Sequence, residues 1–167
     1  NDSKRVVEVT KSLAKYFRLA LNQGHEQISL KDEIDHVRQY LFIQKQRYGG
    51  KLQYEIDELS AYDNYQIPKL ILQPLVENAI YHGIKEINRP GRIQLTVQYQ
   101  SPYIKITIED NGVGLKGKGA SNKALGGVGI QNVQERLALY FGEEFKMEFD
   151  SVENSYTKVC LTIPVSN

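Results

Sequence analysis

The chain has 167 residues, of which 41% are hydrophobic and 25% are charged. This length fits one domain of ordinary size, and the composition excludes a disordered chain because it allows a packed core. The 21 basic and 20 acidic residues give a net charge of +1, so we expect neither a nucleic acid partner nor membrane contact. The one cysteine, Cys160, excludes an internal disulfide framework and indicates a reducing compartment.

Residues 3–22 have the period of a helix. Two sets of apolar residues recur every seven positions along it: Val6, Leu13 and Ala20 and, between them, Val9 and Tyr16. This is an a/d pattern of about two and a half heptads, too short for a firm coiled-coil assignment. Two interpretations stay open: a helix packed on its own domain, or one arm of a helical bundle or dimer. Because the chain begins at Asn1 instead of a methionine, inside what looks like a helix, we expect a fragment of a longer parent protein.

A second helix is predicted from Ser29 to about Arg47. Ser29 with Asp32 three residues later is an acidic variant of the capping box, in which side chains satisfy free N–H groups at a helix start. Gly24 ends the preceding helix, and a Gly-Gly pair ends this one. Its apolar face is formed by Leu30, Ile34, Val37 and Leu41.

Residues 51–57 alternate between polar and apolar side chains and predict a strand. Residues 61–69 are expected to be a loop, in which Pro68 sets the start of a helix over residues 69–83. One broad face of that helix is apolar and should hold it to the sheet: Ile71, Leu72, Leu75, Val76, Ala79 and Ile80.

Residues 92–99 and 103–110 alternate most clearly and predict an antiparallel hairpin with one buried face. A helix over residues 130–141 and strands over 145–150 and 156–165 complete the chain. The inward residues of that helix are expected to be Val133, Leu137 and Tyr140 or Phe141. Mostly antiparallel strands with helices covering one face predict an α/β sandwich.

The second face of the 69–83 helix carries polar and aromatic residues at spacings of three and four: Pro74, Glu77, Asn78, Tyr81 and His82. A solvated face is one interpretation, but asparagine is a poor helix former whose side chain competes with the backbone. An amide oxygen can ligate a hard cation, and a histidine one turn later could hydrogen-bond a phosphate. Asn78 and His82 are therefore candidate binding residues.

Two glycine motifs follow that helix. In the first, IEDNGVGL, Asp110 ends a strand and can accept a hydrogen bond from an exocyclic amine. Gly112 and Gly114 let the backbone approach a flat or phosphate-bearing ligand closely. An ordinary turn is the alternative, although it would not require the second glycine.

In the second motif, LGGVGIQNVQERL, Gly127 and Gly129 lead into a helix whose free N–H groups and dipole favour a phosphate. The motif is neither a Walker A loop nor a full Rossmann fingerprint. Residues 116–126, between the two motifs, could fold over a ligand as a lid with Lys116, Lys118 and Lys123 near phosphates, or could be a flexible loop.

In this order, LQPLVENAIYHG, EDNGVGL and GGVGIQNVQERL resemble the N, G1 and G2 boxes of the histidine-kinase ATP-binding domain, in the GHKL superfamily. ISLKDEIDHVRQYLFIQKQRYGGKLQYEID and IPKLILQPLVENAIYHGI are similar to the LytS/YesM-like branch of bacterial sensor kinases. The resemblance runs from about residue 10 to Pro164. It implies a Bergerat ATP-binding fold, in which helices cover one face of a mixed, mostly antiparallel sheet.

The resemblance implies ATP and Mg²⁺ as cofactors and assigns the phosphate side of the site. Asn78 would ligate the Mg²⁺, and His82 would lie near the phosphates. Gly127 and Gly129 would sit at the triphosphate end of the lid. Glu77, beside the metal ligand, would act on metal-bound water or in acid–base chemistry.

The resemblance also assigns the adenine side. Asp110 would bind the adenine amino group, with Thr157 helping through water. Gly112 and Gly114 would shape the pocket around the base. Tyr156 stands where the family usually has a glycine before this threonine, so Thr157 departs from the pattern in its neighbour.

For the whole chain, the resemblance implies two parts. Residues 1–24 would be the C-terminal part of a dimerisation and phosphotransfer hairpin, and residues 25–167 the catalytic ATP-binding domain. The parent would be a homodimer, membrane-anchored with this portion in the cytoplasm. It would pass the ATP γ-phosphoryl to a histidine on a missing upstream helix and then to a response regulator. Neither His25 nor His36 has the neighbours of the phosphoacceptor motif, so we expect no autophosphorylation of this chain.

Two other classes of function stay open. A GHKL-type ATPase or serine kinase would use the same nucleotide site, but such ATPases usually place an acid four residues before the metal asparagine, where this chain has Pro74. A nucleotide-binding interaction module would use the fold for docking a partner, without catalysis.

Overall fold

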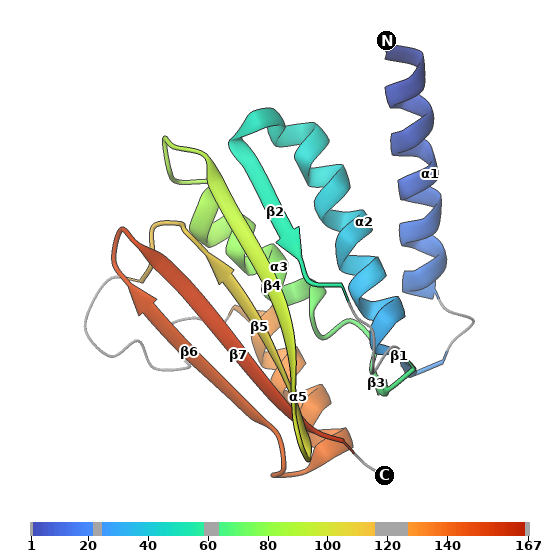
Figure 1. Cartoon of the computed structure of the whole chain (residues 1–167), viewed down its shortest axis with the longest axis vertical. Coiled ribbons are helices and arrows are strands. Elements are labelled where there is room, and N and C mark those ends of the chain that lie inside the picture. The colour runs from blue at the N-terminus through green and yellow to red at the C-terminus, as the bar shows by residue number, and fades with distance from the viewer. Residues whose placement is uncertain (1, 22–24, 59–63, 116–126, 166–167) are drawn as a thin grey trace.

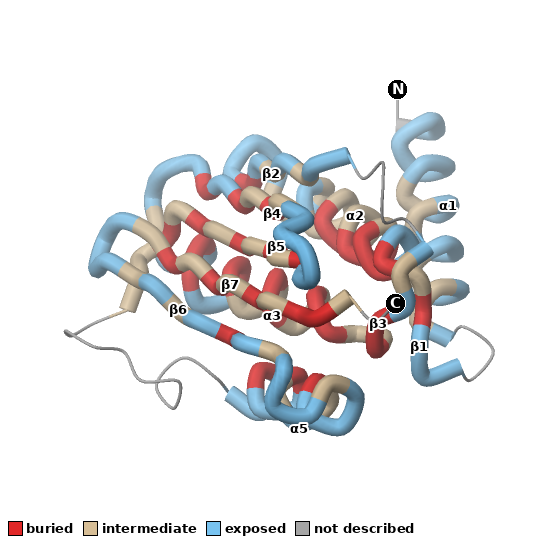
Figure 2. The backbone as a smooth tube through the Cα atoms, turned by 60° about the horizontal axis from the view of Figure 1, so that its bottom comes forward, coloured by how far each residue is buried: buried red, intermediate tan, exposed pale blue. Residues whose placement is uncertain are grey.

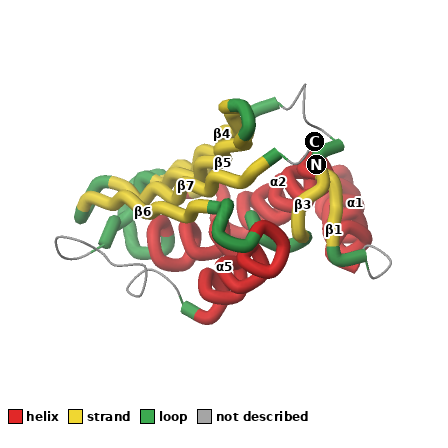
Figure 3. The backbone as a smooth tube through the Cα atoms, turned by 90° about the horizontal axis from the view of Figure 1, so that it is seen from below, coloured by secondary structure: helices red, strands yellow, loops and turns green. Residues whose placement is uncertain are grey.

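The computed structural model describes residues 2–21, 25–58, 64–115 and 127–165 (Figure 1). Its main sheet has five strands in the order β2-β4-β5-β7-β6. The strands are β2 (Leu52–Ile56), β4 (Gly91–Gln100), β5 (Tyr103–Asp110), β6 (Lys146–Val152) and β7 (Tyr156–Pro164). Strand β2 runs parallel to β4, and the other neighbours are antiparallel. The helices lie on one face of this sheet, which confirms the expected α/β sandwich (Figure 3).

The core lies between the sheet and its helices because successive strand residues point to opposite faces. Strand β5 alternates strictly between buried and less buried residues. Its inward residues are Ile104, Ile106 and Ile108, and those of β7 are Val159, Leu161 and Ile163. The buried positions in Figure 2 follow this alternation along the strands. The antiparallel β4–β5 hairpin is confirmed, with Gln100 paired to Tyr103 at its turn.

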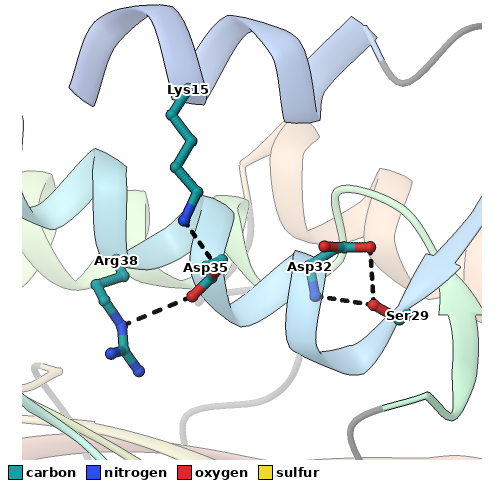
Figure 4. Close-up of polar contacts among 5 residues, drawn as sticks. All are labelled: Lys15, Ser29, Asp32, Asp35 and Arg38. Atoms are coloured by element: carbon teal, nitrogen blue, oxygen red, sulfur yellow. Dashed lines mark hydrogen bonds and ion pairs between the residues drawn. The ribbon is translucent and has the colours of Figure 1, made fainter. Parts of the chain in front are cut away.

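Helices α1 (Asp2–Leu21) and α2 (Leu30–Tyr48) pack against each other. The predicted start of α2 is confirmed, because the Ser29 hydroxyl accepts from the Asp32 N–H at 3.0 Å and donates to the Asp32 carboxylate at 2.8 Å (Figure 4). Lys15 of α1 forms an ion pair with Asp35 of α2 at 2.9 Å. An exposed pair of this kind contributes little, so packing of side chains must hold the two helices together.

Helix α1 has two apolar sides. The a/d pattern predicted from the sequence had placed the residues of both sides on one face. Tyr16 faces α2, because its ring stacks on that of His36. Val6 is 63% exposed and Leu13 42% exposed, so these two members of the heptad pattern point away from α2. They belong to an uncovered row, which we call the outer stripe: Val6, Leu13, Phe17 and Leu21.

The structure corrects the start of the helix predicted over residues 69–83, which we call the site helix. The segment expected to be a loop contains strand β3 (Gln66–Pro68), which pairs antiparallel with β1 (Gln27–Ser29). Pro68 therefore ends a strand instead of starting a helix. Leu70 has a φ of 59°, a left-handed conformation that turns the chain before the helix. Helix α3 (Gln73–Asn78) begins only at Gln73, with Pro74 in its first turn.

Helix α5 (Val128–Phe141) has the expected inward face. Val133 and Leu137 are buried, and Phe141 packs against the core. Of the two aromatic alternatives, Phe141 is the inward one and Tyr140 is 37% exposed, because the spacing of four from Leu137 leads to Phe141. Gly142 ends the helix with a φ of 58°, as glycine permits. The expected end of the first helix at Gly24 lies outside the described residues.

A buried carboxylate fixes the beginning of α3. Glu33 of α2 is fully buried, and its two oxygens accept hydrogen bonds from the backbone N–H groups of Leu70, Ile71 and Leu72 at 3.0, 2.8 and 2.8 Å. Burial raises the pKa of Glu33, while these N–H donors and the charge of Arg136 oppose that rise. These N–H groups belong to the turn directly before α3, so Glu33 of α2 caps the turn that leads into this helix.

We predict that Glu33→Ala destabilises the fold by about 2 to 4 kcal/mol, because three buried N–H groups then lose their acceptor. Urea denaturation followed by circular dichroism measures this loss. Glu135→Ala is the control, since Glu135 is an exposed glutamate of α5 and should change stability by less than about 0.5 kcal/mol. Equal stabilities of the two variants would contradict the capping role of Glu33.

Candidate functional site

The site helix changes its winding in the middle of the polar stripe. After Asn78, the α-helical turns of α3 continue as a π-helix over Ala79–Ile84. The Lys85 N–H donates to the Ile80 carbonyl at 2.9 Å, a bond to the fifth preceding residue. Short π-helical turns inside α-helices occur frequently at functional sites. The inward face of this helix is buried as predicted: Ile71, Leu72, Leu75, Val76, Ala79 and Ile80.

The outward face of the helix lines a hollow, so it is not simply a solvated surface. All five residues of the predicted stripe border this hollow: Pro74, Glu77, Asn78, Tyr81 and His82. The opposite wall is the start of α5, with Gly127, Gly129 and Ile130. The structure thus brings together one end of α5, where N–H groups are free, and the polar face of the site helix. We call this hollow the phosphate end, because such a helix start favours an anion.

A second hollow adjoins the first and reaches the sheet. Its wall is formed by Asn78, His82, Gly83, Asp110, Gly114, Leu115, Gly127 and Thr157. Asn78, His82 and Gly127 line both hollows, so the two form one cleft between the site helix, the ends of β5 and β7, and the start of α5. We call the part at Asp110 and Thr157 the base end. Every predicted binding residue except Gly112 lines this cleft.

Asp110 is the buried polar group of the base end. Its side chain is 3% exposed at the end of β5, and Thr157 of β7 lies directly across from it. The Gly112 N–H donates to Asp110 Oδ1 at 2.8 Å. Burial raises the pKa of Asp110 to about 7, because the charged form loses water, while the Gly112 N–H opposes the rise.

Gly112 shapes the cleft from behind. A side-chain carbon at Gly112 would lie 2.4 Å from the backbone of Gly83, and one at Gly83 would lie 2.4 Å from Asp110 Oδ1. Two glycines therefore let the π-helical turn touch the strand end that carries Asp110. Gly83 was not among the site residues predicted from the sequence. The indication in the sequence is a glycine inside a helical pattern, which often has a packing or functional reason.

Thr157 is held by a serine that the sequence-based reading also missed. Ser151 Oγ lies 3.3 Å from Thr157 Oγ1, accepts from the Leu115 N–H at 2.9 Å and donates to the Tyr156 carbonyl at 2.8 Å. Because the Ser151 proton goes to that carbonyl, Thr157 is the donor of the pair. Thr157 therefore offers an acceptor to the cleft. The unusual Tyr156 does not fill the cleft, since its hydroxyl bonds Asp150 on the other face of the sheet.

The side-chain oxygens at the phosphate end fit a small hard cation as ligands. Glu77 and Asn78 adjoin one another there and offer carboxylate and amide oxygens. Within the described residues, no group of three or more His, Cys, Asp or Glu side chains could hold a metal by itself. One carboxylate oxygen from Glu77 and one amide oxygen from Asn78 suit Mg²⁺, which takes one or two protein oxygens and completes its shell with water and phosphate. The predicted lid, with Lys116, Lys118, Lys123 and Gly126, lies outside the described residues.

Two family models match the chain. One described as histidine kinase matches residues 1–52, and one described as histidine kinase-, DNA gyrase B- and HSP90-like ATPase matches residues 64–167. The second model covers the site helix, both glycine motifs and Thr157.

Curated relatives are sensor histidine kinases. Sensor histidine kinase YesM of Bacillus subtilis is 32% identical over 167 residues, which cover 100% of this chain and 29% of the relative. Sensor histidine kinase BtsS of Escherichia coli is 33% identical over 163 residues, which cover 98% of this chain and 28% of the relative. The chain thus spans less than a third of the length of these relatives.

The fold recurs in solved histidine kinases. The histidine kinase AdeS of Acinetobacter baumannii superimposes with a TM-score of 0.64 at 17% sequence identity, and the match covers 100% of this chain and 82% of that one. At this identity the likeness concerns the fold alone.

We predict that Asp110→Asn stabilises the protein increasingly as the pH rises. The Asp110 carboxyl stays protonated in the fold up to about pH 7, whereas in the unfolded chain it ionises near its usual value of 3.8. Wild-type stability should therefore fall as the pH rises from about 4 to 7, and the variant should escape this loss of roughly 2 to 4 kcal/mol. Urea denaturation at pH 5, 6, 7 and 8 measures the difference, and a constant difference would contradict the raised pKa.

Proposed function

The chain belongs to the histidine kinase-, DNA gyrase B- and HSP90-like ATPase family, and on that premise we propose that it is the ATP-binding catalytic part of a two-component sensor kinase. The observation that carries the proposal is the continuous cleft, which joins a buried acceptor at one end to a helix start and an amide–carboxylate pair at the other. A nucleotide has the same order of chemistry along its length: a base with a donor amine, then a chain of phosphates.

At the base end, Asp110 and Thr157 both present acceptors. An adenine amino group can donate to an oxygen of the Asp110 carboxyl, and a water can connect the base to the Thr157 hydroxyl. Gly114 lies at this end with a φ of 63°, and a side-chain carbon there would meet the Val152 carbonyl at 2.1 Å. The backbone at Gly114 thus lies directly against the end of β6 with no room for a side chain, and we propose that Gly112 and Gly114 shape the adenine pocket.

At the phosphate end, Asn78 would hold Mg²⁺, which when bound neutralises the charge of the phosphates. His82 would donate to a phosphate oxygen, and the N–H groups near Gly127 and Gly129 would bind the phosphate tail. Glu77 would orient a water of the metal shell. Catalysis would then come from positioning and charge neutralisation, as in phosphoryl transfer generally.

The phosphoryl acceptor would be a histidine outside this chain. His36 is 1% exposed and stacks on Tyr16, so it cannot reach a phosphate without unfolding. His82 belongs to the cleft, and His25 is exposed just before β1 without the neighbours of an acceptor motif. The proposal therefore includes transfer to an upstream helix of the parent and from there to a response regulator in the cytoplasm. Within the described residues, no helix is long and apolar enough to span a membrane.

We predict that the chain binds ATP with Mg²⁺ and retains no label from γ-labelled ATP. In isothermal titration calorimetry, Asn78→Ala and Asp110→Ala should each weaken binding at least about tenfold. The first variant removes the metal ligand, and the second removes the acceptor for the adenine amino group. Asp150→Ala, on the helix-free face of the sheet, should leave the affinity unchanged.

Three outcomes would change the proposal. Absence of ATP binding, or binding that is indifferent to both cleft variants, would favour an interaction module. Label retained on the isolated chain would contradict transfer to an outside histidine. Rapid ATP hydrolysis that is abolished by Glu77→Gln would favour a GHKL-type ATPase.

We further propose that residues 1–24 belong to a dimerisation hairpin and residues 25–167 form the catalytic domain. The outer stripe of α1 supports this division, because it leaves a row of apolar side chains uncovered while Tyr16 and its neighbours pack on α2. Leu21 is 72% exposed at the end of that row. Burying such a row against a second copy is what the a/d pattern of a helical bundle achieves.

We predict that the double variant Leu13→Lys, Phe17→Lys shifts the chain toward the monomer in sedimentation equilibrium, because two charges would enter the helix contact. Glu8→Lys is the control, since Glu8 points away from the outer stripe on the same helix. Its dimerisation should match the wild type. A wild-type chain that stays monomeric at every accessible concentration would overturn the assignment of the outer stripe as a self-association surface.

A further inference from the structure

A chain of side chains joins helix α1 to the cleft. Gln73, the first residue of α3, donates from Nε2 to the Tyr16 hydroxyl at 2.7 Å and to Glu77 Oε1 at 2.7 Å. The two protons of one amide nitrogen thus have an acceptor each. We call this connection the Tyr16–Gln73–Glu77 bridge. Its first member lies on α1, and its last lines the phosphate end.

The Tyr16 end of the bridge is tied to both N-terminal helices. The Tyr16 ring stacks on His36 of α2 with centroids 4.5 Å apart and planes inclined by 22°. Burial lowers the pKa of His36 to about 4, so this ring is neutral at physiological pH. Burial also raises the pKa of Tyr16, so its hydroxyl stays protonated. The hydroxyl is therefore a stable acceptor that moves with α1.

The middle of the bridge is held in one orientation by its two acceptors. Gln73 Oε1 is buried and has no hydrogen-bond partner among the described residues. A buried oxygen without a donor costs free energy, so the amide adopts this orientation because its nitrogen gains Tyr16 and Glu77 together. Removing either acceptor leaves the amide free to turn. Gln73 therefore responds to the position of Tyr16.

We propose that Gln73 is a positioning residue that sets the Glu77 carboxylate at the phosphate end according to the place of helix α1. The proposal rests on the proposed function, since Glu77 matters as the neighbour of the metal-binding Asn78. When α1 carries Tyr16 away, the amide loses one acceptor, turns, and releases Glu77. The place of α1 is thereby transmitted to the cation site through the side chain of Gln73.

Two variants test the bridge by calorimetry with ATP, in Mg²⁺ and in excess chelator. Gln73→Met keeps the length of the side chain but removes the amide, and Tyr16→Phe removes the hydroxyl but keeps the ring on His36. Loss of one hydrogen bond should weaken ATP binding in Mg²⁺ about five- to tenfold for Gln73→Met and about threefold for Tyr16→Phe. Binding in chelator should change much less. The double variant should bind as Gln73→Met does, because Tyr16 acts only through Gln73.

The matched control is Gln131→Met. Gln131 donates to Glu135 Oε1 at 3.0 Å, the same glutamine–glutamate pair at the same spacing, but it lies exposed on α5. This variant should bind ATP as the wild type does. A Tyr16→Phe chain with wild-type affinity, or additive losses in the double variant, would overturn the bridge.

A nucleotide-free measurement separates failure of the bridge from failure of the proposed function. In nitrogen-15 NMR spectra, the side-chain amide signals of Gln73 should shift in Tyr16→Phe and in Glu77→Gln, and stay in place in Gln131→Met. Unshifted Gln73 signals refute the bridge whether or not ATP binds. If the Gln73 signals shift in these two variants while the wild-type chain binds no ATP, the bridge is kept and the nucleotide site is refuted.

Discussion

The position of the site helix depends on one buried carboxylate. Glu33 of α2 accepts hydrogen bonds from the backbone N–H groups of Leu70, Ile71 and Leu72, so it holds the turn that leads into α3. Arg136 of α5 holds the same turn from the opposite side, since its guanidinium donates to the Lys69 carbonyl at 2.6 Å. Two helices that wall the cleft are thus joined at the turn that aims Asn78 and His82. The positions of Asn78 and His82 therefore depend on how the helices pack around this turn.

The features that could be predicted from the sequence are those that neighbouring residues determine. Alternation gave the β4–β5 hairpin, a Ser29–Asp32 pair gave the start of α2, and glycine motifs gave the strand end and helix start that wall the cleft. It could not predict Glu33 as a cap, because that carboxylate lies 37 to 39 residues away from the N–H groups it accepts. Two three-residue strands, β1 and β3, were equally invisible, since so short a pair has no periodicity of its own.

Helix α1 shows why one heptad pattern could support two interpretations. Its apolar residues form two groups, of which one packs on α2 and the other is exposed. Tyr16 packs on α2, and the outer stripe faces away from it. A pattern of seven residues does not separate two stripes that lie close together on a helix of 3.6 residues per turn. The contact with His36 divides them: it shows Tyr16 packed on its own domain, and the bundle or dimer arm stays a prediction for the outer stripe.

The π-helical turn at Ala79–Ile84 makes the length of the site helix matter as much as its composition. The widened turn inserts an extra residue between Asn78 and the point where Gly83 meets Asp110. Deleting one residue between Asn78 and His82 would close the turn to an ordinary α-helix. These two residues would then lie three positions apart instead of four, and their angle around the helix would change. This helix can therefore drift by substitution over long evolutionary times, while gain or loss of a single codon within it is far less tolerable.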